Sequence, residues 1–154
     1  MLMEKKLKIL IVESRFYSEI SDQLLLGAKK ELESENISFE IVSVPGALEI
    51  AQAMNIIISN NVNSSKQVGY DGFIALGCVI RGETSHYDYV CSESIRWLNY
   101  LSIKNNLCLG NGILTCENIE QANNRAHVDK GNKGGSAAKA TLALVKIKKT
   151  YRIR

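Results

Sequence analysis

Apolar residues recur along this chain in two patterns that alternate with each other. Short, mostly apolar runs lie at residues 7–12, 73–80 and 107–115, and such runs are typical of strands covered on both faces. Between them lie segments whose apolar residues recur every three or four positions, which is the spacing of a helix with one buried face. This alternation predicts parallel strands joined by helical crossovers.

The first part of the chain predicts two strands, each followed by a helix. Polar residues 13–15 end the first run, and Ser18 can cap the helix that follows. Residues 37–44 alternate between apolar and polar side chains, so one face of this strand meets water and it belongs at an edge of the sheet. The first helix has its apolar positions at Ile20, Leu24, Ala28 and Leu32, and the second at Ala47, Ile50, Ala51, Met54, Ile57 and Ile58.

The second part of the chain repeats the pattern after a polar stretch, 59–71, that predicts a surface loop. The strand at 73–80 reads as central, and the strand at 107–115 contains Gly110 and Gly112, where another segment must approach the backbone closely. Helices are expected over 117–127 and from Ser136 to Tyr151. A further helix after the central strand buries a stripe formed by Val90, Ser94, Trp97, Leu98 and Leu101.

Four strands alternating with helices predict an α/β fold, a three-layer α/β/α sandwich with a four-stranded parallel sheet. The edge-like second strand and the buried third favour the order 2-1-3-4, which is the flavodoxin-like arrangement. Ligands of such sheets bind beyond the carboxyl ends of the strands. On that order Phe16, Glu49, residues 81–86 and Asn111 are expected at one rim.

Composition fits one globular domain over residues 1–154, since the hydrophobic share is 45% and there is a single proline. The formal net charge of +3 is concentrated in the last helix, and few aromatic residues accompany it, which disfavours nucleic-acid binding. No apolar run approaches the ~20 residues that a membrane span requires. The four cysteines form no C-x-x-C pair, which is typical of small buried side chains in a reducing compartment. A cytoplasmic protein is therefore expected.

Local motifs give little chemistry by themselves. The chain has no G-x-G-x-x-G or P-loop pattern, and His86 and His127 have no ligand partner at metal spacing. Glu49 can either complement the dipole of its helix or accept a hydrogen bond from a ligand hydroxyl. The pair Phe16-Tyr17 can cover a ligand or plug the gap to the next helix, and the residues alone favour the plug.

Taken together, four motifs resemble lumazine synthases. They span residues 44–50 (VPGALEI), 79–90 (VIRGETSHYDYV), 115–118 (TCEN) and 131–134 (GNKG), in one order along nearly the whole chain. The resemblance implies condensation of 5-amino-6-(D-ribitylamino)uracil with 3,4-dihydroxy-2-butanone 4-phosphate to 6,7-dimethyl-8-ribityllumazine, the penultimate step of riboflavin synthesis. It also implies that no cofactor or metal is needed.

By the same resemblance, His86 is the proton carrier, and phosphate binds Glu83, Thr84 and Arg125. The aminouracil pocket is expected to be lined by Phe16, Ala47, Leu48, Glu49, Cys78, Val79, Ile80, Asn111 and Lys133. Members of the family are homo-oligomers built from pentamers, and Asn111, Arg125 and Lys133 are expected from a neighbouring subunit.

The chain departs from the usual family pattern at three positions. Leu48 and Asn111 stand where aromatic residues are common, and Asp129 stands where lysine is frequent. Fewer aromatic walls should weaken stacking on the substrate by about 1–3 kcal/mol. Two other functions therefore stay open, a weakly active binder of lumazines or flavins and a shell-forming protein. The presence of both His86 and Arg125 favours the enzyme, because neither alternative requires a base beside an anion site.

Overall fold

Four parallel strands form the middle layer of the computed structural model, which describes residues 5–62 and 69–152. The strands are β1 (Lys8–Ser14), β2 (Ser38–Val44), β3 (Gly72–Ile80) and β4 (Leu109–Cys116). Their order is β2-β1-β3-β4, as expected, with β1 and β3 in the centre and β2 and β4 at the edges.

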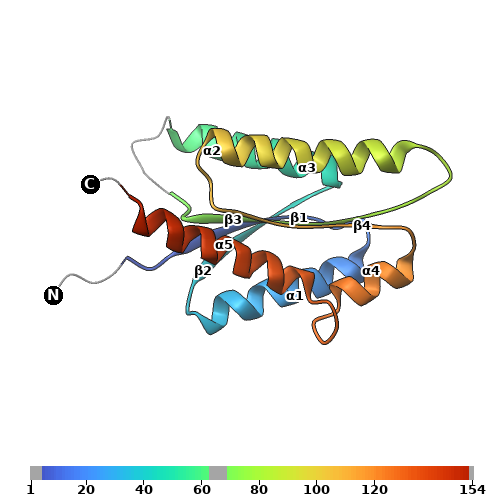
Figure 1. Cartoon of the computed structure of the whole chain (residues 1–154), viewed down its shortest axis with the longest axis horizontal. Coiled ribbons are helices and arrows are strands. Elements are labelled where there is room, and N and C mark those ends of the chain that lie inside the picture. The colour runs from blue at the N-terminus through green and yellow to red at the C-terminus, as the bar shows by residue number, and fades with distance from the viewer. Residues whose placement is uncertain (1–4, 63–68, 153–154) are drawn as a thin grey trace.

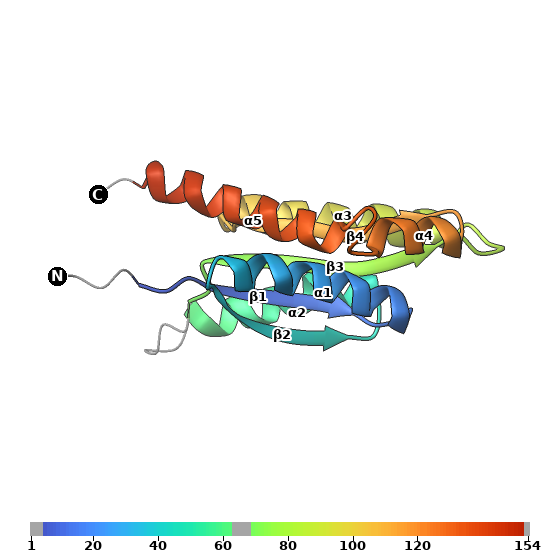
Figure 2. The ribbon, with the colours of Figure 1, turned by 90° about the horizontal axis from the view of Figure 1, so that it is seen from below.

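Helices cover both faces of the sheet, so the expected three-layer sandwich is confirmed (Figure 1). One layer consists of α2 (Ala47–Val62) and α3 (His86–Lys104). The other consists of α1 (Ser18–Ser34), α4 (Ile119–Ala126) and α5 (Lys133–Thr150). Both ends of the described chain lie at the amino end of the strands, opposite the loops that follow β1 and β3 (Figure 2). No helix among the described residues is long and apolar enough to cross a lipid bilayer.

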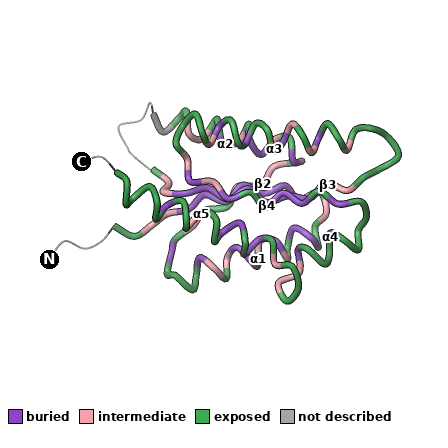
Figure 3. Tube along the Cα trace, in the orientation of Figure 1, coloured by how far each residue is buried: buried purple, intermediate pink, exposed green. Residues whose placement is uncertain are grey.

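The apolar core lies on both sides of the two central strands (Figure 3). Residues 9–12 of β1 are completely buried, with Ile9 and Ile11 packed towards α1 and Leu10 and Val12 towards α2. Alternate side chains of a strand point to opposite faces, so a strand covered on both sides must be apolar throughout. This is why the continuous runs identified the central strands.

Several boundaries differ from those expected. The strand β1 includes Glu13 and Ser14, which are buried and pair with Ser43 and Val44 of β2. The Glu13 carboxylate lies 3.2 Å from the Arg15 guanidinium and accepts a hydrogen bond of 3.0 Å from the Ser43 hydroxyl. Charged and hydrogen-bonding partners offset the cost of burying that carboxylate, so a polar residue can occupy a position near the end of a central strand.

Helix ends were also displaced from their expected positions. Tyr17, not Ser18, is the N-cap of α1, and it makes no side-chain capping bond. The expected loop at 59–71 was wrong at its beginning, because α2 continues to Val62, while residues 63–68 lie outside the described part of the chain. The helix α5 begins three residues before Ser136, because Asn132 caps it by accepting a hydrogen bond from the Gly135 amide.

The expected burial of Trp97 was wrong. Its side chain is 47% exposed, packs edge-to-face on Tyr100, and donates to the Glu93 carboxylate. The other four positions of the predicted stripe on α3 are buried. An apolar position at helical spacing can therefore lie on the border of the stripe, and Trp97 belongs to the outer surface of the α2 and α3 layer.

The helix α5 packs against α1 and β4 at positions where only a hydrogen atom fits. A methyl group at Gly134 would overlap the carbonyl group of Leu24, and one at Gly110 would overlap the carbonyl oxygen of Ala137. The expected close approach at Gly110 is thus confirmed. The buried Thr141 hydroxyl lies 2.8 Å from the Phe73 carbonyl oxygen and joins α5 to β3. These contacts hold the α5 layer against the sheet.

We expect Gly134→Ala to lower the free energy of unfolding by about 1–3 kcal/mol, because overlap with a backbone carbonyl cannot be relieved by a side-chain rotation. Alanine favours a helix over glycine by about 1 kcal/mol, which opposes the effect without cancelling it. Denaturant unfolding followed by circular dichroism measures the change. The control is Gly69→Ala, where an added methyl group meets no atom within 4 Å. Equal stability of both variants would contradict this packing.

Candidate functional site

A pocket of about 290 Å³ opens at the carboxyl ends of the central strands. Its walls come from three segments that are far apart in the sequence, at and after the carboxyl ends of β1, β2 and β3. The lining residues are Phe16, Tyr17, Gly46, Ala47, Leu48, Glu49, Cys78, Val79, Ile80, His86 and Val90. Every residue expected from the ends of the first three strands to line the aminouracil pocket is among them, together with His86.

The two aromatic residues after β1 differ in burial and in packing. Phe16 is 73% exposed at the mouth of the pocket, so it does not plug the gap to the next helix. Tyr17 is half-buried and packs against the apolar cluster on the α1 side of the sheet. The two rings meet edge-to-face with centroids 5.0 Å apart. An exposed aromatic face beside a pocket offers a flat ring a stacking surface.

The segment after β2 supplies a carboxylate to the same pocket. Pro45, the only proline of the chain, and Gly46 precede α2. The Glu49 amide donates a hydrogen bond of 3.2 Å to the Gly46 carbonyl oxygen. Glu49 lies in the first turn of α2, is partly buried, and makes no salt bridge within the described chain. Both sequence interpretations of Glu49 thus remain compatible with its position, since it complements the helix dipole and also faces the pocket.

His86 is the first residue of α3, at the opposite wall of the pocket. Before it, residues 81–85 form an exposed loop in which the Thr84 hydroxyl oxygen lies 3.3 Å from the His86 amide. Ser85, the N-cap, makes no side-chain capping bond. The amides of His86 and Asp88 are thus bonded locally, whereas those of Glu83, Thr84 and Ser85 have no acceptor within the described chain and stay available to an anion. The helix dipole favours negative charge at the same place.

Two arginines near this rim differ in their partners. Arg81 pairs with Glu117 at 2.8 Å and with Asp88 at 3.2 Å, and its guanidinium lies over the Tyr87 ring. The hydrogen bond to Glu117, followed by that to Asp88, raises the pKa of Arg81. Arg125 lies exposed near the end of α4 and has no ion pair in the described part of the chain. Arg125 can thus accept an anion, whereas the charge of Arg81 is already matched.

Five of the expected site residues do not line the pocket of their own chain. Glu83 and Thr84 lie in the exposed loop just before His86. Arg125 and Lys133 belong to the layer of α4 and α5, on the face of the sheet opposite α3. The expectation that Asn111 lies near the rim was wrong. It pairs with Ala75, and five residues of β4, about 16 Å of strand, separate it from Cys116 at the rim. Asn111 is an exposed residue in the middle of an edge strand.

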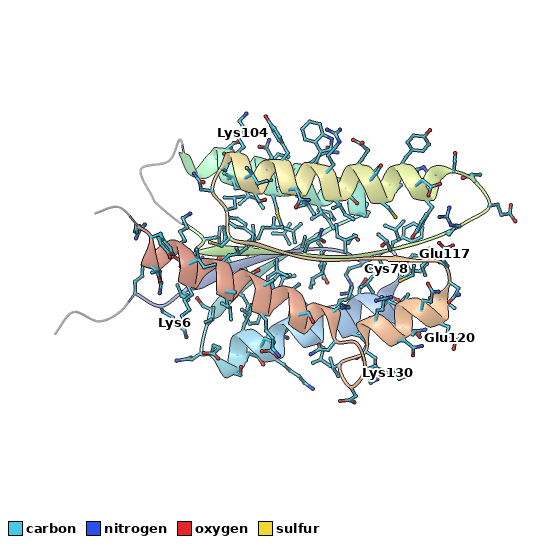
Figure 4. The ribbon with its side chains drawn as sticks, viewed as in Figure 1. Lys6, Cys78, Lys104, Glu117, Glu120 and Lys130 are labelled. Atoms are coloured by element: carbon cyan, nitrogen blue, oxygen red, sulfur yellow. The ribbon has the colours of Figure 1, made fainter. Side chains whose placement is uncertain are left out.

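The cysteines near the pocket have no reactive character. Burial, and next the neighbouring Cys116 thiol, raises the pKa of Cys78 to about 12. A thiol with that pKa is protonated at neutral pH and is a poor nucleophile. Figure 4 shows Cys78 inside the molecule, towards the same end as Glu117. All four cysteines are free, and the described residues hold no group of three or more side chains suited to a metal ion.

Sequence reasoning missed three residues of the pocket, Tyr17, Gly46 and Val90. Val90 was assigned to the core, which is also correct because it is buried beneath the pocket. Tyr17 was treated together with Phe16 as one aromatic pair. Both rings line the pocket, but Phe16 is exposed, whereas Tyr17 also packs against the apolar cluster on the α1 side of the sheet. The junction of β1 and α1, with its change from extended to helical backbone, is the signal that could have separated them.

Comparison with known proteins gives a consistent result. The family model described as 6,7-dimethyl-8-ribityllumazine synthase matches residues 6–149. A protein of that name from Bartonella henselae is 50% identical over 96% of this chain and 92% of its own length, and one from Bartonella tribocorum is 48% identical over 97% and 95%. The 6,7-dimethyl-8-ribityllumazine synthase 1 of Rhizobium meliloti is 49% identical over 94% and 93%.

Matches of this extent cover every element that forms the rim pocket, from β1 to α5. A solved lactose-specific IIB component domain from Streptococcus pneumoniae aligns with 12% identity and a TM-score of 0.33, which is too low to carry an argument. The resemblance found in the four sequence motifs is thereby confirmed, and this chain belongs to the 6,7-dimethyl-8-ribityllumazine synthase family.

Proposed function

We propose that this chain condenses 5-amino-6-(D-ribitylamino)uracil with 3,4-dihydroxy-2-butanone 4-phosphate, and that the rim pocket is where it does so. The products are 6,7-dimethyl-8-ribityllumazine, phosphate and water. One observation carries the proposal: in a chain of this family, a single pocket joins an exposed aromatic ring, a carboxylate and an imidazole from three strand ends. We further propose that the reaction takes place in the cytoplasm.

The chemistry requires few groups. An amine of the uracil adds to the ketone and water leaves, phosphate is eliminated, and a second amine closes the ring with loss of a second water. Each step moves a proton near neutral pH, and imidazole is the side chain best suited to that task. His86 lines the pocket at the start of α3 and makes no side-chain hydrogen bond in the described chain. It can therefore exchange protons with a bound substrate without first breaking an internal contact.

The aminouracil binds in the main cavity. Phe16 would stack on the pyrimidine ring, and Glu49 would accept hydrogen bonds from ribityl hydroxyls. Ala47, Leu48, Cys78, Val79 and Ile80 complete the walls. Leu48 is 39% exposed and offers no flat ring, so stacking falls mainly on Phe16. Such a pocket binds the heterocycle through one aromatic face and its edges through polar groups.

The phosphate of the second substrate would bind at the start of α3. The amides of Glu83 and Thr84, with the Thr84 hydroxyl, would donate hydrogen bonds to it. A forked contact from Arg125 would complete the site. Since Arg125 does not line the pocket of its own chain, we propose that it reaches the pocket of a neighbouring subunit. Lys133 and Asn111 would come from that neighbour as well.

The exposed surface supports such an assembly. Large apolar side chains remain exposed on α2 and α3, namely Ile56, Trp97, Tyr100 and Ile103, and on α5, namely Leu144 and Ile147. Exposed apolar groups gathered on particular faces are typical of protein interfaces. Two different faces of one chain that contact each other in successive copies form a ring when the rotation between copies closes, and an open filament when it does not. We propose a ring of five, the number that the family resemblance implies.

We expect His86→Ala to lower turnover by about 10- to 1,000-fold with little change in the Michaelis constants, because a proton carrier acts mainly on the barrier. Positioning of the two reactants continues to contribute, so activity should not vanish. Steady-state formation of lumazine absorbance measures the effect. An unchanged turnover number would exclude His86 from the mechanism.

Arg125→Ala should raise the Michaelis constant for the phosphate-bearing ketone by about 10- to 100-fold, because a forked arginine–phosphate contact is lost. The constant for the aminouracil should change far less, since that substrate carries no phosphate. Arg96→Ala is the matched control, because Arg96 lies on α3 outside the pocket lining, where it pairs with Glu93 and lies over the Trp97 ring. If both Michaelis constants rose equally in Arg125→Ala, a structural role would explain the result better.

Sharing of the site between subunits can be tested by mixing the two weakened variants and measuring activity at a ketone-phosphate concentration well below the wild-type Michaelis constant, where each variant alone should keep about a tenth of wild-type activity or less. Subunits carrying His86→Ala and Arg125→Ala, unfolded together and refolded at equal concentration, should regain up to about a quarter of wild-type activity, because that share of interfaces pairs an intact His86 with an intact Arg125. Each variant refolded alone is the control. Light scattering coupled to size separation gives the mass of the active peak. An active species of 17.1 kDa, the mass of one chain, would exclude the shared site and the ring.

A further inference from the structure

Tyr17 lines the pocket, and the proposed function gives no role to its hydroxyl group. It lines the cavity beside Phe16 and Cys78. Its ring packs against the apolar cluster on the α1 side of the sheet, whereas His86 and Val90 enter from α3 on the other side. Tyr17 is therefore the aromatic residue that reaches the pocket from the layer opposite the proton carrier.

The backbone holds Tyr17 firmly. As N-cap of α1 it has an extended conformation, and its carbonyl oxygen accepts a hydrogen bond of 2.9 Å from the Ser21 amide. The buried Ser21 hydroxyl lies 2.9 Å from the same oxygen and 3.0 Å from the Ser14 carbonyl oxygen. The edge-to-face contact with Phe16 fixes the ring from its other side. A fixed ring loses little conformational entropy when it binds a ligand.

The phenol group is neutral and without a partner inside the described chain, where no hydrogen bond to its oxygen occurs. Burial, and next the proximity of Cys78, raises the pKa of Tyr17 above its ordinary value. At neutral pH the hydroxyl can both donate and accept a hydrogen bond. A partly buried hydroxyl gains from a partner, and in this pocket the bound substrate can provide one.

We propose that the Tyr17 hydroxyl hydrogen-bonds the aminouracil substrate and contributes to the selection of that substrate. This inference rests on the proposed function. The aminouracil is favoured over the ketone phosphate for two reasons. The Tyr17 ring contacts the ring of Phe16, on which the pyrimidine would stack. Tyr17 also packs on the α1 side of the sheet, away from the amides that precede α3. The substrate presents ring carbonyls, ring N–H groups and ribityl hydroxyls, all of which suit a phenol.

Tyr17→Phe removes the hydroxyl and keeps the ring, so the packing against α1 and Phe16 is preserved. We expect the Michaelis constant for the aminouracil to rise about 3- to 10-fold, the effect of one neutral hydrogen bond. Turnover at saturation and the Michaelis constant for the ketone phosphate should stay within about twofold of wild type. Binding of the product lumazine, followed by its fluorescence, should weaken by a similar factor.

The control is Tyr151→Phe, which removes a phenol that is 79% exposed at the far end of α5. It should leave all constants unchanged. Unchanged aminouracil and lumazine affinity in Tyr17→Phe would overturn the inference, and so would an equal rise in both Michaelis constants, which indicates a structural role. Absence of lumazine formation by the wild-type protein would instead refute the proposed function, so the two failures are distinguishable.

Discussion

Burial of β1 and β3 on both faces is the constraint on which the remaining structure depends. A parallel strand covered on both sides offers no exposed polar position except at its ends. All loops that follow these strands then meet at one edge, where helix amino ends supply free amide groups. Phe16, Glu49 and His86 reach one pocket for this reason, although more than thirty residues separate each from the next. The site is a consequence of topology before it is one of side-chain chemistry.

The two arginines near that edge differ in their ion pairs. Arg81 is paired with carboxylates, whereas Arg125 has no ion pair in the described part of the chain. Arg81 ties the loop before α3 to the loop before α4 through Asp88 and Glu117. Exposed ion pairs contribute little stability singly, but a network joining two loops restrains both. The restrained loop carries Thr84 and ends at His86. Because the charge of Arg81 is already matched, the proposed recognition of phosphate would fall to a guanidinium from elsewhere.

The sequence predicted the architecture well because the spacing of apolar residues along a strand or helix reflects which of its faces are buried. Strand order followed from one alternating run and one continuous run, and the helical stripes identified the buried faces of α1 and α2. Features that depend on local partners were harder. Glu13 can be buried because Arg15 and Ser43 face it, and the spacing of apolar residues does not predict such side-chain pairs. Asn111 is different, because it is the central residue of the predicted strand 107–115, so its distance from the rim followed from the predicted strand itself.

The same limit explains what could be learned about the site. Motif resemblance identified the lining of the rim and assigned Phe16 alone to stacking, whereas the residues by themselves treated Phe16 and Tyr17 as one pair. The two rings share the pocket, but Phe16 is exposed and Tyr17 is packed against the α1 side of the sheet. On the proposed division, one chain contains the stacking face, the carboxylate and the imidazole, while the phosphate-binding arginine belongs to its neighbour. A separated chain would therefore keep most contacts to the aminouracil and lose the strongest contact to the ketone phosphate. Assembly would then affect the second substrate more than the first, because the forked charged contact to its phosphate crosses between subunits, whereas the aminouracil would lose only the contacts of Asn111 and Lys133.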